Sequence, residues 1–133
     1  MIVVDTNIIG YLFLSSERSV LSERVLLKDN EWAAPILWRS EFRNVLTLYI
    51  RKGIIQLEQA QRIMNSALEL LRGREYEVPS FEVLRLASIS NCSAYDCEFI
   101  ATANDLKVPL VTVDKQLLRE FSSVAISLNS YSE

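Results

Sequence analysis

Short apolar runs alternate along this chain with longer segments in which apolar residues recur every three or four positions. The short runs predict strands, and the longer segments predict helices. The expected strands are residues 2–5, 32–34, 76–78, 109–113 and 124–127. The expected helices are residues 7–14, 18–29, 36–52, 56–72, 80–90, 94–106 and 115–121. This order favours an α/β fold with a mainly parallel sheet that helices cover on both faces.

Glycine and proline residues mark where the expected helices begin and end. Gly53 and Gly73 each follow the last periodic residue of a helical segment, where glycine commonly ends a helix. Pro35 and Pro79 each follow a strand-like run and suit the start of the next helix. The chain contains no repeat, low-complexity segment or linker rich in proline and glycine. We therefore expect residues 1–133 to form a single domain with its own core.

Composition and charge disfavour several classes of protein. No apolar run approaches the roughly 20 residues that a membrane-spanning helix needs. The first strand also lacks the preceding basic segment of a signal peptide, so we expect a cytoplasmic protein with no membrane partner. The absence of histidine and the presence of only two cysteines argue against a structural zinc centre. The net charge of −3 argues against binding nucleic acid through an overall positive field.

Two acids directly follow strand-like apolar runs. Asp5 follows the run that begins at Ile2, and Asp114 follows the run that begins at Leu110. Active sites in folds of this class lie outside the carboxyl ends of the strands, so we expect both acids at that edge of the sheet. Each acid also suits a second role as the cap of the following helix, because its carboxylate accepts hydrogen bonds from free backbone N–H groups.

Two further acids lie on the apolar faces of expected helices. Glu41 falls on the face formed by Trp38, Val45 and Leu48. Asp96 falls on the face formed by Phe99, Ile100 and Ala103. A glutamate on such a face is rarely buried without a partner, and the alternative to a functional role is an ion pair between Glu41 and a nearby arginine. For Asp96 the alternative is a capping box with Ser93.

A convergence of these four acids would require a cation. Mutual repulsion and burial would both oppose ionisation of Asp5, Glu41, Asp96 and Asp114. A hard divalent cation with oxygen ligands removes this cost, and Mg²⁺ or Mn²⁺ is the usual choice for phosphate chemistry. The pattern therefore predicts an enzyme that hydrolyses phosphodiesters with water activated by a metal ion. We expect the three aspartates to bind the metal and Glu41 to bind it through water or to orient the nucleophile.

Polar residues beside the acids suit supporting roles. Asn44 lies one helical turn beyond Glu41, where its amide suits a hydrogen bond to the carboxylate or to a substrate phosphate. Thr112 lies two residues before Asp114 and projects from the same face of its strand. Its hydroxyl therefore suits the orientation of a carboxylate or of a water molecule on the metal.

The order and spacing of these residues resemble the PIN-domain nucleases. The resemblance rests on Val4-Asp5-Thr6-Asn7, on Ser40-Glu41 with Asn44, on Tyr95-Asp96 before Phe99-Ile100-Ala101, and on Thr112-Val113-Asp114. It extends from Ile2 to about Ser127. A stand-alone domain of this size is most similar to the VapC-type toxins, the ribonuclease halves of type II toxin–antitoxin pairs.

The resemblance implies a three-layer α/β/α sandwich around a central, mainly parallel five-stranded sheet. It implies one or two Mg²⁺ or Mn²⁺ ions held by the four acids, with polar neighbours at Thr6, Asn7, Asn44 and Thr112. The implied substrate is RNA. The implied partners are a second copy of the chain and a small antitoxin whose tail fills the active groove. The helical hairpin 36–72 is the expected contact surface, because it carries more apolar surface than a solvent-facing pair of helices needs.

Three other functions are compatible with parts of this pattern. The same acids suit a PIN-domain nuclease that processes RNA without an antitoxin. A catalytically silent module that binds RNA or protein is less favoured, because none of the four acids is missing. A phosphotransfer domain like the haloacid-dehalogenase enzymes needs a second aspartate two residues after Asp5, where this chain has Asn7.

Overall fold

A computed structural model describes residues 1–133 and contains one sheet of five parallel strands. The strands are β1 (Ile2–Val4), β2 (Trp32–Pro35), β3 (Glu75–Tyr76), β4 (Leu110–Thr112) and β5 (Ala125–Ser127), in the spatial order β3-β2-β1-β4-β5. The chain moves outward from β1 through β2 and β3, and then returns to the other side of β1 as β4 and β5. The direction of winding therefore reverses between β1 and β4, which is where folds of this kind bind ligands.

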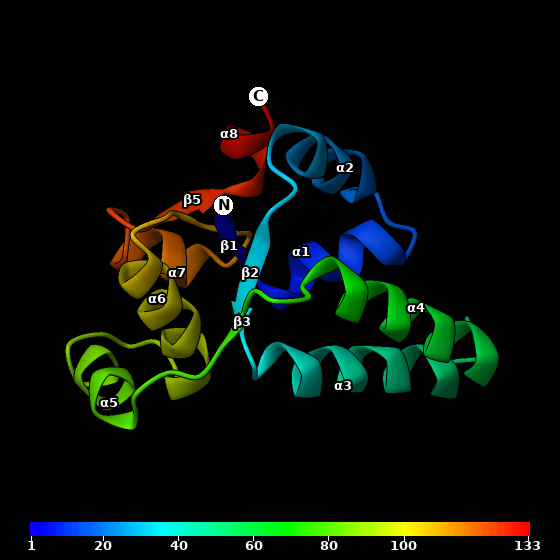
Figure 1. Cartoon of the computed structure of the whole chain (residues 1–133), viewed down its shortest axis with the longest axis horizontal. Helices are drawn as coiled ribbons and strands as arrows, with labels where there is room; N and C mark the ends of the chain where they lie inside the picture. The colour runs from blue at the N-terminus through cyan, green and yellow to red at the C-terminus, as the bar shows by residue number, and fades with distance from the viewer.

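Eight helices connect and cover the strands. They are α1 (Thr6–Phe13), α2 (Ser19–Lys28), α3 (Trp38–Arg51), α4 (Leu57–Leu70), α5 (Ser80–Ser88), α6 (Ala94–Leu106), α7 (Lys115–Glu120) and α8 (Leu128–Ser132). In Figure 1, α5, α6 and α7 lie to the left of the sheet, whereas α1, α3 and α4 lie to the right. Helix α6 packs against β1, β2 and β4, and α1 contacts β4 from the other layer. The expected three-layer α/β/α fold is therefore confirmed.

The three inner strands, β2, β1 and β4, are largely apolar because helices bury both of their faces, whereas the outer strands β3 and β5 are only partly buried. Ile2, Val3 and Val4 of β1 are all fully or almost fully buried, as are Leu110 and Val111 of β4. A strand covered on both sides needs no alternation of polar and apolar residues. The polar residues that follow β1 and β4 are therefore the first that can leave the core, and they do so at the carboxyl edge of the sheet.

The observed elements differ from the expected ones at a few points. The chain beyond β5 forms the short helix α8, which the periodicity of the sequence did not predict. Pro35 does not begin a helix: it ends β2, and α3 begins at Trp38. Proline is tolerated there because the N–H groups of Ala34 and Ile36, on either side of it, donate the hydrogen bonds to the β3 segment, at Arg74 and Tyr76. Pro79 does precede a helix, as the N-cap of α5.

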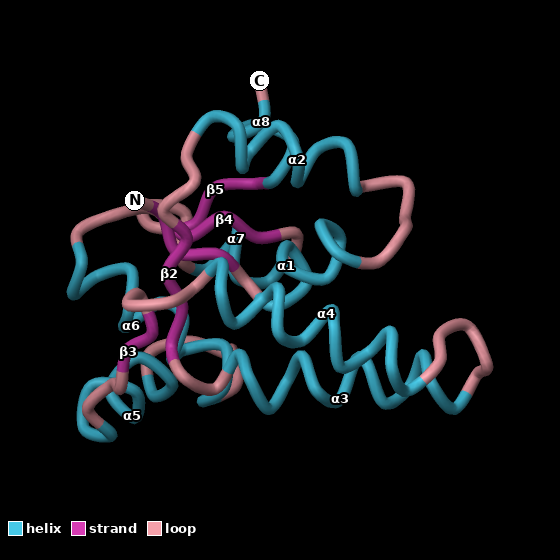
Figure 2. Tube along the Cα trace, turned by 45° about the vertical axis from the view of Figure 1, so that its right-hand side comes forward, coloured by secondary structure: helices cyan, strands magenta, loops and turns pink.

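Helices α3 and α4 form an antiparallel hairpin that extends away from the sheet (Figure 2). Gly53 lies in the connection between the two helices with a φ of +72°, a left-handed conformation that glycine adopts without strain. None of the eight helices combines the length and the apolar character needed to cross a membrane.

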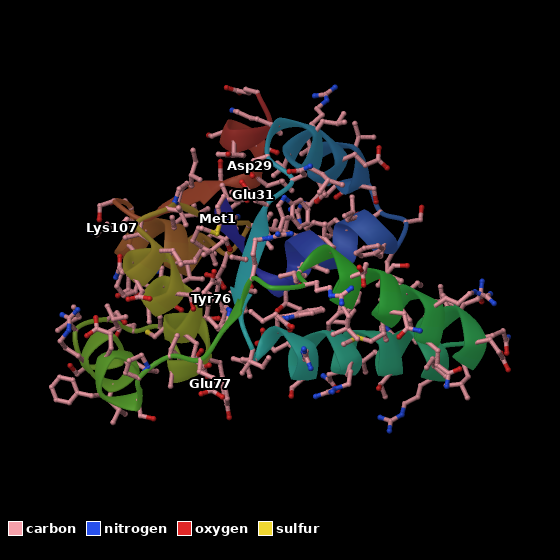
Figure 3. All side chains as sticks on the ribbon, viewed as in Figure 1. Met1, Asp29, Glu31, Tyr76, Glu77 and Lys107 are labelled. Atoms are coloured by element: carbon pink, nitrogen blue, oxygen red, sulfur yellow. The ribbon has the colours of Figure 1, made fainter.

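The opposite end of the sheet is held by an ion pair. Figure 3 shows Met1 beside Asp29 and Glu31, which lie in the segment that leads into β2. The amino group of Met1 donates a hydrogen bond of 2.8 Å to Asp29 Oδ2. This contact anchors the amino end of β1 and leaves its carboxyl end, at Asp5, for the site described below.

Candidate metal-binding active site

Asp5 caps a helix and lies in the candidate site at the same time. It is the N-cap of α1, and its Oδ1 accepts a hydrogen bond of 2.8 Å from the backbone N–H of Thr6. Its Oδ2 accepts a second hydrogen bond of 2.8 Å from the hydroxyl of Thr112 at the end of β4. The cap and the functional interpretation are therefore compatible, because the two oxygens of the carboxylate serve different donors.

Asp114 has the same double role at the next strand. It is the N-cap of α7, and its Oδ1 accepts a hydrogen bond of 2.9 Å from the backbone N–H of Leu117. The backbone N–H of Asp114 donates to the hydroxyl oxygen of Thr112 at 3.0 Å. Thr112 thus links the two strand ends: its hydroxyl accepts from Asp114 and orients the carboxylate of Asp5.

Glu41 is held by a threonine rather than by an arginine. The hydroxyl of Thr6 donates a hydrogen bond of 2.7 Å to Glu41 Oε1. Arg39, two residues before Glu41, forms a bidentate pair with Glu75 of β3 instead, and the Nε1 of Trp38 donates to the same carboxylate. Arg43, two residues after Glu41, donates to the hydroxyl of Ser40. The alternative ion pair for Glu41 is therefore wrong.

The buried face of α3 is displaced from the expected one. The buried residues are Trp38, Phe42 and Leu46, whereas Leu48 is exposed. Glu41 lies beside this buried stripe and is half-buried. Asn44 does not bond to the Glu41 carboxylate in the structure, and its exposed amide lies at the rim of the same cavity.

Asp96 lies in the first turn of α6. Ser93 is the N-cap of α6, and its hydroxyl oxygen accepts a hydrogen bond of 3.0 Å from the backbone N–H of Asp96. Phe99, Ile100 and Ala103 of the same helix are buried, as the helix pattern predicted, and Asp96 is half-buried above them. The capping arrangement fixes the start of α6 and leaves the Asp96 carboxylate facing the site.

The four acids line one cavity of about 280 Å³. The full lining consists of Asp5, Thr6, Asn7, Glu41, Asn44, Val45, Asp96 and Asp114. Of the eight residues that the sequence analysis singled out, seven line the cavity. The eighth, Thr112, lies outside the lining and donates a hydrogen bond to Asp5. Val45 is the only lining residue that the sequence analysis did not single out as a site residue. No lysine or arginine lines the cavity, so no basic side chain within its lining offsets the charge of the acids.

Burial and mutual repulsion both disfavour ionisation in this cavity. Burial raises the pKa of Asp5 from 3.8 to about 6, although the hydrogen bonds from Thr112 and Thr6 partly oppose the shift, and the charges of Glu41 and Asp96 add to it. The pKa of Glu41 is raised by burial and by the charge of Asp96. The pKa of Asp96 is raised by burial and by the charge of Asp114. The carboxylates of Asp5, Glu41 and Asp96 therefore share one cause of their raised pKa values, burial, and nearby negative charge adds to each shift.

The donors in the cavity fit a hard divalent cation. They are carboxylate, amide and hydroxyl oxygens, and the site contains no thiolate or imidazole that would favour zinc or copper. No three acidic, cysteine or histidine side chains are arranged to hold one ion by themselves. Both carboxylate oxygens of Asp5 and one oxygen each of Glu41 and Asp114 already accept hydrogen bonds from hydroxyl or backbone donors. A cation in this cavity would thus need water among its ligands, as Mg²⁺ usually does.

A fifth acid near the site escaped the sequence analysis. Glu98 of α6 is half-buried, and its pKa is raised by burial and by the charge of Glu41. It lies only two residues after Asp96, so helical periodicity places it on a different face from that acid. The effect of Glu41 on Glu98 depends on how the tertiary fold places α6 relative to α3, which no local pattern in the sequence reports.

Comparisons with known proteins agree with this fold. The family model described as PIN domain matches residues 2–124. The chain is 26% identical over 126 residues to Ribonuclease VapC3 of Pyrobaculum aerophilum, an alignment that covers 92% of this chain and 96% of that protein. The crystal structure of PAE2754 from Pyrobaculum aerophilum has a similar fold, with a TM-score of 0.77 and 24% identity over 98% of this chain and 92% of that one.

A second solved structure has the same architecture. The crystal structure of FitAcB from Neisseria gonorrhoeae superposes with a TM-score of 0.71 and 20% identity, covering 96% of this chain and 98% of that one. These structural likenesses support the fold, and the family model supplies the family because it spans nearly the whole sequence. The chain with four acids at the carboxyl edge of its parallel sheet therefore belongs to the PIN domain family.

Proposed function

We propose that this chain is a divalent-metal-dependent ribonuclease that hydrolyses phosphodiester bonds in RNA. The observation that supports this most is the cavity in which four carboxylates, contributed by four separate segments, meet without a basic side chain. Such a concentration of like charge is unfavourable in the free protein, and a cation relieves it. The similarity to a protein named Ribonuclease VapC3 supports RNA as the substrate.

Each of the eight predicted residues has a role in this proposal. Asp5, Asp96 and Asp114 hold Mg²⁺ or Mn²⁺, and Glu41 completes the site directly or through water. A bound cation of this kind lowers the pKa of a water molecule and offsets negative charge on the phosphate. Thr112 and Thr6 fix the rotamers of Asp5 and Glu41 through the hydrogen bonds already described. Asn7 and Asn44, which are exposed at the rim, donate hydrogen bonds to the phosphate.

We assign Glu41 as the general base that accepts the proton of the attacking water. The chain contains no histidine, and no lysine, tyrosine or cysteine lines the cavity, so a carboxylate is the side chain available to accept the proton of the attacking water. Only one oxygen of Glu41 receives a hydrogen bond from Thr6, at 2.7 Å, and the other oxygen is left for the nucleophile. The raised pKa of Glu41 moves this group toward the operating pH, which favours proton transfer.

The biological role that we propose for this ribonuclease is that of the toxin in a toxin–antitoxin pair. The name of the relative and the motif resemblance support this assignment. It implies a small antitoxin as partner, a homodimer of single-domain subunits comprising residues 1–133, and a cytoplasmic location shared with the RNA. A PIN-domain nuclease that processes RNA without an antitoxin would use the same cavity, and the genes adjacent to this one would distinguish the two.

The decisive experiment is cleavage of a mixed pool of structured RNA by the purified chain. Reactions contain Mn²⁺ or EDTA, and Asp5→Asn is the inactive control. Cleavage that requires the metal and disappears in the variant supports the proposal. Cleavage that survives in Asp5→Asn contradicts the assignment of the site, and a complete lack of cleavage favours the silent binding module. Asp105→Asn, at an exposed acid outside the cavity, should cleave like the wild type.

A further inference from the structure

The carboxylate of Glu75 on β3 holds the first turn of α3 through three hydrogen bonds. Its Oε2 accepts bonds of 2.6 Å from Nε1 of Trp38 and from Nε of Arg39. Its Oε1 accepts a bond of 2.5 Å from Nη2 of Arg39. Glu75 does not line the cavity that contains the four acids, and the catalytic proposal gives these contacts no role.

The start of α3 depends on such contacts because no side chain caps it. Its N-cap residue is Leu37, which makes no side-chain hydrogen bond to the helix. The first turn of a helix has backbone N–H groups without partners inside the helix, and a side-chain cap usually binds one of them. In α3 the side chains of Trp38 and Arg39 instead attach this turn to a neighbouring strand through Glu75.

The backbone of β3 holds the connection between β2 and α3. The backbone N–H of Ile36 donates a hydrogen bond of 2.9 Å to the carbonyl oxygen of Tyr76, which directly follows Glu75. Ile36 and Leu37 are the two residues between β2 and α3. Strand β3 is the outer strand of the sheet beside β2 and is only two residues long (Figure 1). This short strand therefore fixes the entry into α3 with both its backbone and its side chain.

Burial makes the contacts of Glu75 difficult to replace. The side chain of Glu75 is only 12% exposed, and Trp38 is fully buried. The hydrogen bond from Arg39 holds the pKa of Glu75 below its usual value, although burial opposes the shift, so the carboxylate is charged at neutral pH. Without an acceptor at residue 75, the indole N–H of Trp38 would be buried and unpaired, which is unfavourable. The first turn of α3 would then move to find another partner.

The same turn of α3 carries Glu41, three residues after Trp38. The carboxylate of Glu41 accepts a hydrogen bond of 2.7 Å from the hydroxyl of Thr6, which belongs to α1. The position of Glu41 is thus set from two sides, by Thr6 at its carboxylate and by Glu75 at its helical turn. Hydrogen bonds and proton transfer both depend on distance and direction, so a small displacement of this turn would misplace the general base.

We propose that Glu75 is a positioning residue for the general base, and that it holds the first turn of α3 so that Glu41 meets both the Thr6 hydroxyl and the attacking water. This inference rests on the proposed ribonuclease function. It makes the rate of cleavage depend on a residue outside the cavity, in a strand that contributes no side chain to the cavity lining.

The first test removes the acceptor oxygens of Glu75. Glu75→Met should lower kcat for RNA cleavage about tenfold with little change in KM, because it misplaces the base and leaves the groups that contact the substrate unchanged. Glu75→Gln keeps one acceptor oxygen and should lower kcat only about threefold. The rates are measured at a temperature at which circular dichroism shows each variant to be fully folded, so a loss of stability alone would not change kcat.

Two further variants complete this test. Glu82→Met is the matched control, because Glu82 forms a bidentate pair of the same kind with Arg85, but within α5, and it should leave kcat unchanged. Arg39→Met keeps the hydrogen bond from Trp38 and replaces Glu75→Met if that variant does not fold. It should also lower kcat without raising KM. An unchanged kcat, or a higher KM at unchanged kcat, in folded Glu75→Met or Arg39→Met overturns the inference.

A double-mutant cycle tests whether Glu75 acts through Glu41. Thr6→Val removes the other anchor of Glu41 and should lower kcat about tenfold in the wild type. In Glu75→Met the same substitution should lower kcat by no more than about twofold, because the base is already misplaced. Equal effects of Thr6→Val in the two backgrounds would show that Glu75 does not act through Glu41. That result overturns the inference and leaves the ribonuclease proposal intact.

The same cycle measured on unfolding separates this inference from the nuclease. Urea denaturation in EDTA needs no catalysis. Thr6→Val should raise the equilibrium constant for unfolding about tenfold in the wild type and less than about threefold in Glu75→Met, because the Thr6–Glu41 hydrogen bond needs the turn to be held in place. This coupling in a protein that cleaves no RNA would support the positioning of Glu41 and count against the nuclease. Additive effects would refute the positioning, whether or not the wild type cleaves RNA.

Discussion

At the scale of single residues, Asp5 carries the clearest conflict between folding and ionisation. Its pKa rises from 3.8 to about 6 because burial outweighs two hydrogen bonds to the carboxylate. The folded protein therefore binds this proton more tightly than the unfolded chain does. The resulting stabilisation is complete below about pH 3.8 and is lost as the pH rises through about 6. At neutral pH the metal-free protein thus carries an unfavourable charge at Asp5.

Replacement of this carboxylate should stabilise the metal-free protein. In EDTA at neutral pH, Asp5→Asn should raise the free energy of unfolding by on the order of 1–3 kcal/mol, because the variant has no charge to bury. The gain should disappear near pH 4, where Asp5 is protonated in the wild type. Urea denaturation over a series of pH values measures both effects. A variant that is no more stable than the wild type at neutral pH would contradict the role of burial at Asp5.

Thr112 should contribute to stability through two hydrogen bonds. Thr112→Val removes the donor to Asp5 Oδ2 and the acceptor for the backbone N–H of Asp114 while preserving the shape of the buried side chain. The expected cost is about 1–3 kcal/mol, together with a further rise in the pKa of Asp5. Thermal unfolding measures the loss. Thr102→Val is the matched control, because the buried hydroxyl of Thr102 bonds only to a helix carbonyl, that of Glu98. Equal losses in the two variants would argue against a special role for Thr112.

At the scale of elements, α3 contacts the core, the active-site cavity and strand β3 through different residues. Trp38, Phe42 and Leu46 face the core, and Glu41 with Val45 faces the active-site cavity. Its first turn is attached to β3 through Glu75, whose side chain is only 12% exposed and accepts hydrogen bonds from Arg39 and Trp38. This attachment fixes the end of α3 that carries Glu41. The far end of the helix is free of the sheet and continues into the hairpin with α4.

The α3–α4 hairpin should mediate association between subunits. Leu48 is 45% exposed and Ile54 is 60% exposed on this projecting element, more apolar surface than two solvent-facing helices need. Leu48→Arg and Ile54→Arg should each shift the protein toward monomer in size-exclusion chromatography with light scattering. Leu27→Arg is the control, because Leu27 is 88% exposed but lies on α2. Dimers that persist in both hairpin variants would exclude this surface.

At the scale of the whole molecule, the parallel sheet assembles the site. Asp5 and Asp114 follow β1 and β4, the adjacent strands between which the winding reverses. Glu41 and Asp96 reach the same point from α3 and α6, helices of opposite layers that contribute the remaining walls of the cavity. Because each acid belongs to a different segment, only the complete fold creates the concentration of charge. Metal binding and folding should consequently be coupled.

A divalent cation should stabilise the folded protein in a manner that depends on the acids. Mn²⁺ or Mg²⁺ at one hundred times its Kd should stabilise the wild type by about 2.7 kcal/mol, because the unfolded chain has no assembled site. Differential scanning fluorimetry should show a higher Tm with metal in the wild type and little change in Asp96→Asn or Asp114→Asn. Glu77→Gln, at an exposed acid outside the cavity, should respond like the wild type. An undiminished response in both aspartate variants would place the ion elsewhere.

The local pattern of the chain determined most of its elements, although not α8, and it identified the four acids that line the cavity. Apolar runs too short for helices and too uniform for half-exposed strands specified buried parallel strands, and Asp5 and Asp114 could be located at their carboxyl ends on that basis alone. The helix faces of Glu41 and Asp96 were also readable, although the buried stripe of α3 proved to be offset and leaves Leu48 exposed. Periodicity identifies the apolar face of a helix. It does not give the exact rotation of that face relative to the core.

Tertiary packing alone decided which side chains meet. The hydrogen bond from Thr112 to Asp5 joins residues 107 positions apart, and that from Thr6 to Glu41 joins residues 35 positions apart. Spacing along a chain determines neighbours only within an element. Contacts between elements depend on the rotation and register with which their buried faces pack, and these were determined only when the whole core was assembled.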